Sequence, residues 1–120
     1  QRQVILVVED DPAVRRVVGD MLASLNYRTA FASDVAEARD VVNARRIDMV
    51  LSDVILPGGQ SGLDLGAELA MERPNLPVLF VSGYTGNPDH SRDCDCPPDR
   101  LLQKPFDRGQ LARFLAQALD

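Results

Sequence analysis

Short apolar runs alternate along this chain with segments whose apolar residues recur at helical spacing. Residues 4–8 form a continuous apolar run, which predicts a strand buried on both faces of a sheet. Four more strands are predicted at residues 28–32, 49–52, 77–81 and 101–103, with helices near 12–25, 34–45 and 61–73. A last helix is predicted to place Leu111, Phe114, Leu115, Ala118 and Leu119 on one face. This alternation predicts an α/β fold, a doubly wound five-stranded parallel sheet with helices on both faces, in one domain over residues 1–120.

Composition narrows the class of protein. The chain has 120 residues, is 45% hydrophobic and carries a net charge of −5. An acidic domain of this kind is not expected to bind nucleic acid directly, since such binding usually requires a basic surface. No apolar run approaches the ~20 residues of a membrane span, so we expect a cytoplasmic domain without membrane contact. Gln1 is not an initiator residue, which favours a segment of a longer, even membrane-attached, parent protein.

Reactive side chains follow the predicted strands. In open parallel sheets, ligands bind beyond the carboxyl ends of the strands. The residues found there are Glu9, Asp10 and Asp11 after the first strand, Asp53 after the third, Ser82 after the fourth and Lys104 after the fifth. We therefore expect these carboxylates, the hydroxyl and the ammonium group to share one edge of the sheet.

This set of side chains suits phosphoryl transfer. Close carboxylates repel one another, and Mg²⁺ relieves such repulsion while keeping sites for water and phosphoryl oxygens. A carboxylate can also act as a nucleophile and form an aspartyl phosphate. The transfer depends on positioning and charge neutralisation, which Lys104 and the metal ion would supply, while Ser82 would donate a hydrogen bond.

In their order and spacing, these residues resemble the response-regulator receiver family over essentially the whole chain. The matching pieces are Glu9-Asp10-Asp11, Asp53 with Pro57 four residues on, Ser82-Gly83 and Lys104-Pro105-Phe106. The resemblance implies a flavodoxin-like sheet of strand order 2-1-3-4-5. It also implies a signalling function in a two-component phosphorelay.

The resemblance assigns roles around the metal. Asp53 would accept a phosphoryl group from a phosphohistidine on a partner, either a histidine kinase core or a histidine phosphotransfer protein. Asp11 is expected to contact Mg²⁺ directly and Asp10 partly through water. Asp53 and the backbone carbonyl of Ile55 would complete the protein ligands. The domain would thus catalyse its own phosphorylation and dephosphorylation.

The resemblance also implies a conformational switch. Lys104 would pair with the phosphoryl oxygens, and Ser82 would move toward them and alter contacts with partners, a second copy of the domain among them. The family often has Tyr or Phe three residues before the lysine, a side chain that turns inward on activation, and this chain has Leu101 there. The resemblance therefore does not determine which movement would follow that of Ser82. The segments around 57–62, 82–85 and 101–106 resemble receivers of hybrid sensor histidine kinases; a stand-alone single-domain response regulator is the alternative.

Other functions fit the residues less well. A Mg²⁺-dependent phosphatase resembling the haloacid dehalogenase family would carry a second Asp two residues after the nucleophile, and Ile55 stands there. A flavin or nucleotide binder would need a phosphate-binding loop after the first strand, where the acidic run would repel phosphate. A receiver that serves only for docking would usually lack the acidic pair, the acceptor or the lysine, and all of these are present.

Two features have plain structural explanations. Asp11 before Pro12 is a typical helix N-cap, a role that uses one carboxylate oxygen and is compatible with metal binding through the other.

His90, Cys94 and Cys96 match no zinc-binding spacing, and cysteines this close rarely form a disulfide. We interpret 83–99 as a polar loop in which a short helix is possible.

Overall fold

A computed structural model describes residues 3–56, 61–82, 101–103 and 106–119. Its strands are β1 (Val4–Val8), β2 (Arg28–Ala32), β3 (Met49–Asp53), β4 (Val78–Ser82) and β5 (Leu101–Gln103). Its helices are α1 (Pro12–Ser24), α2 (Val35–Ala44), α3 (Gly62–Glu72) and α4 (Arg108–Leu119). The short helix considered within 83–99 lies outside the described residues.

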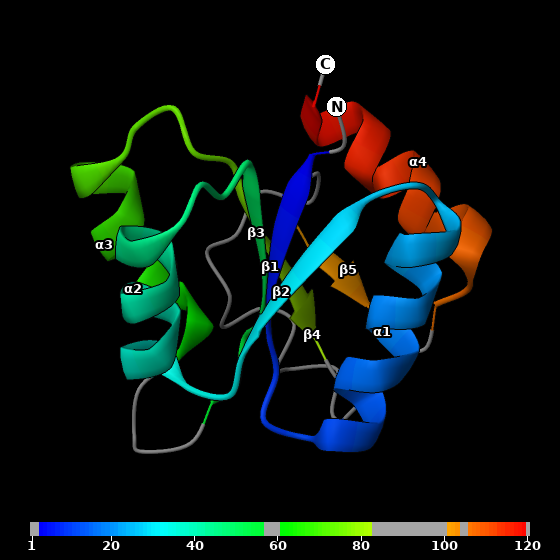
Figure 1. The fold of residues 1–120 in the computed structure, drawn as a ribbon, viewed down its shortest axis with the longest axis horizontal. Helices are drawn as coiled ribbons and strands as arrows, with labels where there is room; N and C mark the ends of the chain where they lie inside the picture. Colours follow the sequence, from blue (N-terminus) through cyan, green and yellow to red (C-terminus); the bar gives the residue numbers. More distant parts are fainter. Residues whose placement is uncertain (1–2, 57–60, 83–100, 104–105, 120) are drawn as a thin grey trace.

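The strands form one five-stranded sheet in the order β2-β1-β3-β4-β5. Every pairing in it is parallel, and all strands run toward the lower edge in Figure 1. The predicted fold class and strand order are confirmed. Because the strands are parallel, their carboxyl ends, which carry the predicted site residues, meet at a single edge of the sheet.

Helices cover both faces of the sheet, with α1 and α4 on one side and α2 and α3 on the other (Figure 1). Each position of β1 is buried, and its side chains alternate between the two cores. The core under α2 and α3 contains Leu6, Val8, Val35, Ala38, Val42, Val50, Leu65, Leu69, Val78 and Phe80. The core under α1 and α4 contains Ile5, Val7, Val18, Leu22, Met49, Leu51, Leu79, Val81, Leu111, Phe114 and Leu115.

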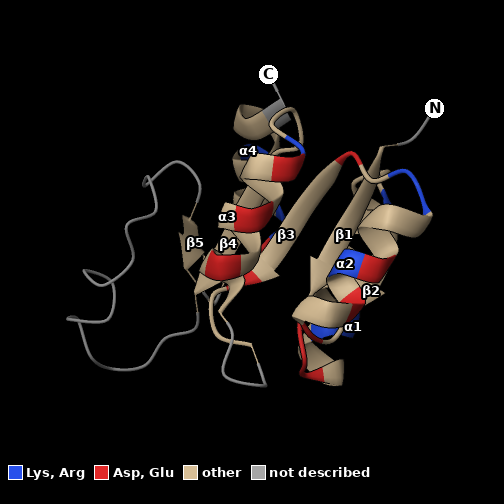
Figure 2. Ribbon diagram, turned by 90° about the vertical axis from the view of Figure 1, so that its left-hand side faces the viewer, with Lys and Arg blue, Asp and Glu red and all other residues tan. Residues whose placement is uncertain are grey.

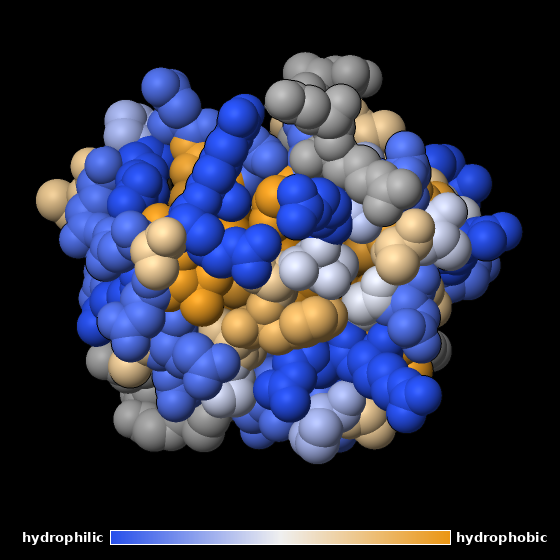
Figure 3. Space-filling model, in the orientation of Figure 1, coloured by the Kyte–Doolittle hydropathy of each residue, from blue (hydrophilic) through white to orange (hydrophobic). Residues whose placement is uncertain are grey.

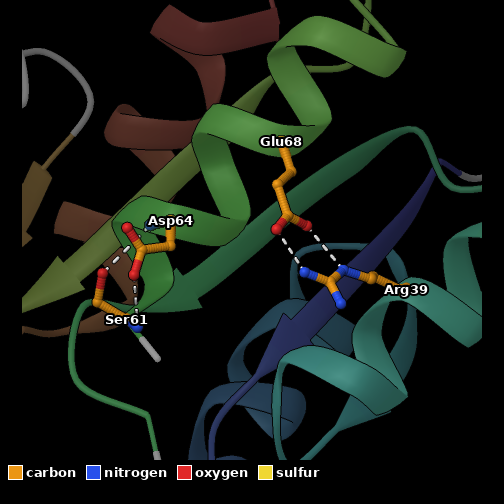
Figure 4. Close-up of polar contacts among 4 residues, drawn as sticks. All are labelled: Arg39, Ser61, Asp64 and Glu68. Atoms are coloured by element: carbon orange, nitrogen blue, oxygen red, sulfur yellow. Dashed lines mark hydrogen bonds and ion pairs between the residues drawn. The ribbon is translucent and has the colours of Figure 1, made fainter. Parts of the chain in front are cut away.

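Two helix starts that the sequence predicts from their capping residues, those of α1 and α3, are confirmed. Asp11 is the N-cap of α1 and accepts hydrogen bonds from the backbone nitrogens of Ala13 (2.9 Å) and Val14 (3.4 Å). Ser61 and Asp64 form a reciprocal capping box at α3, drawn in Figure 4, with distances of 3.2 and 3.3 Å between side chain and backbone nitrogen. These caps satisfy amide groups that the first turn of a helix leaves without partners.

An ion pair joins the two helices on one face. The guanidinium group of Arg39 on α2 binds both carboxylate oxygens of Glu68 on α3, with Nε 2.7 Å from one of them (Figure 4). Hydrogen bonding to Glu68 raises the pKa of Arg39 above its ordinary value. Both side chains are partly exposed, so we regard the pair as fixing the register of α2 against α3 more than as a source of stability.

The surface is largely polar and acidic. Figure 2 shows acidic segments, in red, on the helices and near the lower edge of the sheet. Figure 3 shows apolar surface among the hydrophilic residues of one face. The exposed large hydrophobic side chains include Val17 (52% exposed) and Phe31 (40% exposed). No helix in the described part of the chain is long and apolar enough to cross a membrane.

Candidate functional site

Three carboxylates from two adjacent strands meet at the carboxyl edge of the sheet. Glu9 and Asp10 follow β1, and Asp53 ends β3; each offers one oxygen, and these oxygens all lie within 4.8 Å of one another. Strand pairing causes this meeting, since Val8 lies opposite Ser52 in the parallel register. Glu9 is buried, Asp53 is half-buried and Asp10 is exposed. The cluster therefore opens to solvent through Asp10.

Glu9 is held in place by its backbone and by its side chain. Its amide donates to the carbonyl of Ala32 (3.0 Å), and its carbonyl accepts from the guanidinium of Arg15 (3.2 Å). Its carboxylate accepts from the amide of Asp11 (3.3 Å). The sequence placed Glu9 at this edge of the sheet but did not predict it as a member of the metal site. The sequence feature that could have identified Glu9 is its position directly after the buried strand. A residue at that position can still lie within the sheet and so close to the neighbouring strand.

Asp53 is the last residue of the third strand and is half-buried. The strand continues to be paired just beyond it, where the amide of Val54 donates to the carbonyl of Val81 (3.1 Å). One carboxylate oxygen of Asp53 accepts from the amide of Ile55 at 3.4 Å. The Ile55 side chain is 67% exposed, and its backbone forms an isolated bridge with Ser61. The chain thus turns back toward α3 immediately after the carboxylate.

Asp11 lies beside the cluster and is not one of its three members. Its Oδ1 atom is the acceptor of the α1 N-cap, so only Oδ2 is left for a metal ion. The expected direct contact between Asp11 and Mg²⁺ stays a prediction. The cap does show that this side chain has a structural function of its own.

Of the two remaining predicted site residues, the structure describes Ser82 and not Lys104. Ser82 is the last residue of β4, is half-buried and pairs with Gln103. Lys104 follows Gln103 directly but lies outside the described residues, as do His90, Cys94 and Cys96. Leu101 is half-buried and packs against the core under α2 and α3.

The acidic cluster fits a hard divalent cation. Its donor atoms are carboxylate oxygens, the ligand type that Mg²⁺ and Ca²⁺ prefer, whereas zinc sites typically use nitrogen and sulfur. Mg²⁺ needs only one or two protein carboxylates, with the remaining positions filled by water or substrate oxygens. The partly exposed edge formed by Asp10 and Asp53 would leave room for such oxygens.

Known proteins resemble this chain over nearly its whole length. Response regulator protein PilR of Pseudomonas aeruginosa is 32% identical over 98% of the chain, which covers 26% of PilR. Sensor histidine kinase RcsC of Salmonella typhi is 35% identical over 93% of the chain, which covers 12% of RcsC. The chain therefore spans less than a third of the length of either relative.

A solved structure supports the fold. The response regulator protein TrrA of Thermotoga maritima, determined in complex with Mg²⁺-BeF, superposes with a TM-score of 0.80 at 23% identity. The match covers 97% of this chain and 98% of that one. The family model described as response regulator receiver domain matches residues 5–116. The sheet order, the acidic edge and this match agree, and the chain belongs to the response regulator receiver domain family of two-component phosphorelays.

Proposed function

We propose that this domain, residues 1–120, accepts a phosphoryl group onto Asp53 from a phosphohistidine of a partner protein, in a reaction that requires Mg²⁺. The observation that carries the proposal is the cluster of Glu9, Asp10 and Asp53, whose carboxylate oxygens lie within 4.8 Å of one another at the carboxyl edge of the sheet. Asp53 is its half-buried member, accessible to a donor and partly screened from water.

Asp10, Asp53 and the backbone carbonyl of Ile55 are the ligands that would hold Mg²⁺, with Glu9 beside them. Asp11 would add its Oδ2 atom, because Oδ1 caps α1. The bound ion would supply positive charge next to the transferred group. The TrrA structure in complex with Mg²⁺-BeF supports this choice of metal.

The chemical step needs little beyond positioning. A carboxylate oxygen of Asp53 forms a bond to phosphorus while the bond between phosphorus and the donor imidazole nitrogen breaks. The electron pair of that bond stays with the imidazole, which is then protonated by solvent. Lys104 would pair with the phosphoryl oxygens, and the Ser82 hydroxyl would donate a hydrogen bond to one of them.

Phosphorylation would act as a switch on partner contacts. The new charge at Asp53 would draw Ser82 and Lys104 toward it and bias the neighbouring segments. The partners we propose are a histidine kinase core or a histidine phosphotransfer protein, with a second copy of the domain as a further candidate. Since kinases that supply phosphohistidine use ATP, we place the domain in the cytoplasm.

We propose that the parent protein is a hybrid sensor histidine kinase. The match to part of RcsC supports this assignment, whereas the match to PilR favours a response regulator as the second candidate. Phosphotransfer from a kinase core in the same chain would be independent of protein concentration. Transfer that depends on the concentration of a separate kinase would favour the response regulator.

A phosphatase remains the less supported function. Ile55 stands two residues after Asp53, where such an enzyme would need an acid or base, and its side chain points to solvent with 67% exposure. Turnover of a small phosphate ester by the purified domain would revive this alternative.

The test is intact mass after incubation with Mg²⁺ and acetyl phosphate, for wild type and Asp53→Asn side by side. We expect one phosphoryl adduct on the wild type and none on the variant, with unchanged far-ultraviolet circular dichroism. Labelling that persists in Asp53→Asn would mean another residue is the acceptor. If acetyl phosphate labels neither protein, a phosphorylated histidine phosphotransfer protein is the second donor, and failure with both contradicts the proposal.

A further inference from the structure

The first residue of α3 lies directly against the backbone of Asp53. The amide of Gly62 donates to the carbonyl of Val54 at 2.7 Å. A Cβ atom built on Gly62 would lie 2.0 Å from the carbonyl oxygen of Asp53 and 2.7 Å from the Oγ atom of Ser52. The closer of these atoms belongs to the backbone, so a side chain at Gly62 would have to displace the Asp53–Val54 peptide or the start of α3.

Close approach, and not an unusual backbone conformation, is the reason for glycine here. The φ angle of Gly62 does not lie in the left-handed region, so its backbone is one that other residues adopt readily. Only the missing side chain lets α3 begin against the end of β3. Glycine is therefore needed at residue 62 because α3 begins in contact with the backbone of Asp53, the proposed phosphoacceptor.

Ser52 holds the same carbonyl from the strand side. Its side chain is completely buried, and its hydroxyl donates to the carbonyl oxygen of Asp53 at 2.9 Å. It lies two residues after Val50 and so faces the α2–α3 layer, as Val50 does. The carbonyl of Asp53 is thus fixed by a buried hydrogen bond and by the backbone of Gly62.

We propose that Gly62 and Ser52 are positioning residues that set the direction in which the Asp53 carboxylate leaves β3. This inference rests on the proposed function of Asp53. Rotation of the peptide after Asp53 would turn its Cα and move the carboxylate relative to Glu9 and Asp10, with which it shares a 4.8 Å cluster. A displacement near 1 Å can lower a transfer rate by about a hundredfold.

The matched pair of variants is Gly62→Ala and Gly66→Ala. Both residues belong to α3 and both are in close contact, but a Cβ at Gly66 would meet the end of the Phe80 ring, at 2.6 Å, instead of backbone. Gly66→Ala therefore disturbs the packing of α3 on the sheet without touching the Asp53 peptide. Ser52→Ala, which removes one hydrogen bond and adds no atoms, is the second variant in case Gly62→Ala does not fold.

Two readouts separate positioning from general destabilisation. The first is the rate of adduct formation at saturating Mg²⁺ and acetyl phosphate, at a temperature where circular dichroism shows each variant fully folded. We expect the rate to fall at least about tenfold in Gly62→Ala and a few-fold in Ser52→Ala, and to stay within about twofold of wild type in Gly66→Ala. The second is the amide NMR signal of Val54, expected to shift in Gly62→Ala and Ser52→Ala and less in Gly66→Ala.

The inference is overturned if Gly62→Ala or Ser52→Ala folds and is phosphorylated at the wild-type rate, or if Gly66→Ala loses as much rate as Gly62→Ala. Failure of the proposed function looks different, because the wild type is then unlabelled or Asp53→Asn is labelled. In that case the Val54 signal still decides whether the two residues fix the peptide.

Discussion

Removing the charge of Asp10 should stabilise the metal-free domain and abolish its response to Mg²⁺. Asp10 shares the 4.8 Å cluster with Glu9 and Asp53. At that separation, two unit charges repel by about 1 kcal/mol at the dielectric constant of water, the appropriate value because Asp10 is exposed. Asp10 belongs to two such pairs, so Asp10→Asn should relieve about 1–2 kcal/mol in the absence of metal.

The expected change in melting temperature follows from the size of the chain. A 120-residue domain unfolds with an entropy of about 0.25 kcal/mol/K, so 1–2 kcal/mol corresponds to about 4–8 °C. Wild type should gain about 1.4 kcal/mol, or about 6 °C, at a Mg²⁺ concentration tenfold above its dissociation constant. Asp10→Asn should therefore melt above wild type in EDTA and lose that advantage as Mg²⁺ is added.

Thermal unfolding followed by circular dichroism, in EDTA and in Mg²⁺, measures both effects. Asp40→Asn, an exposed charge on α2, controls for net charge. Asp11→Asn keeps an N-cap side chain, since Asn caps as well as Asp, and tests for a direct metal contact of Asp11. The reasoning about the cluster is refuted if Asp10→Asn melts below wild type in EDTA or keeps the full Mg²⁺ shift. Loss of the shift in Asp11→Asn alone would identify Asp11 as the main ligand.

Two further predictions concern stability. Leu22→Ala truncates a completely buried side chain of α1 and should lower the free energy of unfolding, measured in urea, by about 2–5 kcal/mol. Val17→Ala, at an exposed position of the same helix, should change this free energy by less than about 0.5 kcal/mol. Ser61→Ala, which removes the α3 cap, should cost about 1 kcal/mol in the same assay, and Ser61→Asp should restore most of it. A Ser61→Ala variant as stable as the wild type would mean that the hydroxyl contributes nothing as a cap.

Most of the fold could be predicted because its signals are local. The apolar run of residues 4–8 predicts a strand buried on both faces, and this prediction does not depend on knowing which strands lie beside it. Asp11-Pro12 and the pair Ser61 and Asp64 mark helix starts through contacts that span at most three residues. Parallel connection through helices then leaves few possible topologies.

The site was predicted less completely, because its geometry depends on contacts between strands. The sequence shows three consecutive acids after the first strand, but which of them lies near Asp53 depends on where the pairing of β1 ends. Glu9 is still within hydrogen-bonding reach of the neighbouring strand, through Ala32, and so it enters the cluster while Asp11 caps a helix. The contact of Gly62 with Asp53 depends on how the chain returns from Ile55 to Ser61, which no periodic pattern reveals.

The position of β1 in the sheet has a consequence for synthesis on the ribosome. β1 is made first among the strands, yet it lies between β2 and β3, so its two edges are covered only after Met49–Asp53 has emerged. At about 5–20 residues per second, this apolar strand waits several seconds without its second neighbour. The length of that interval is set by the speed of translation and not by the folding rate of the finished domain. Among the five strands of this sheet, β1 is therefore the one that we expect to depend most on protection by a chaperone.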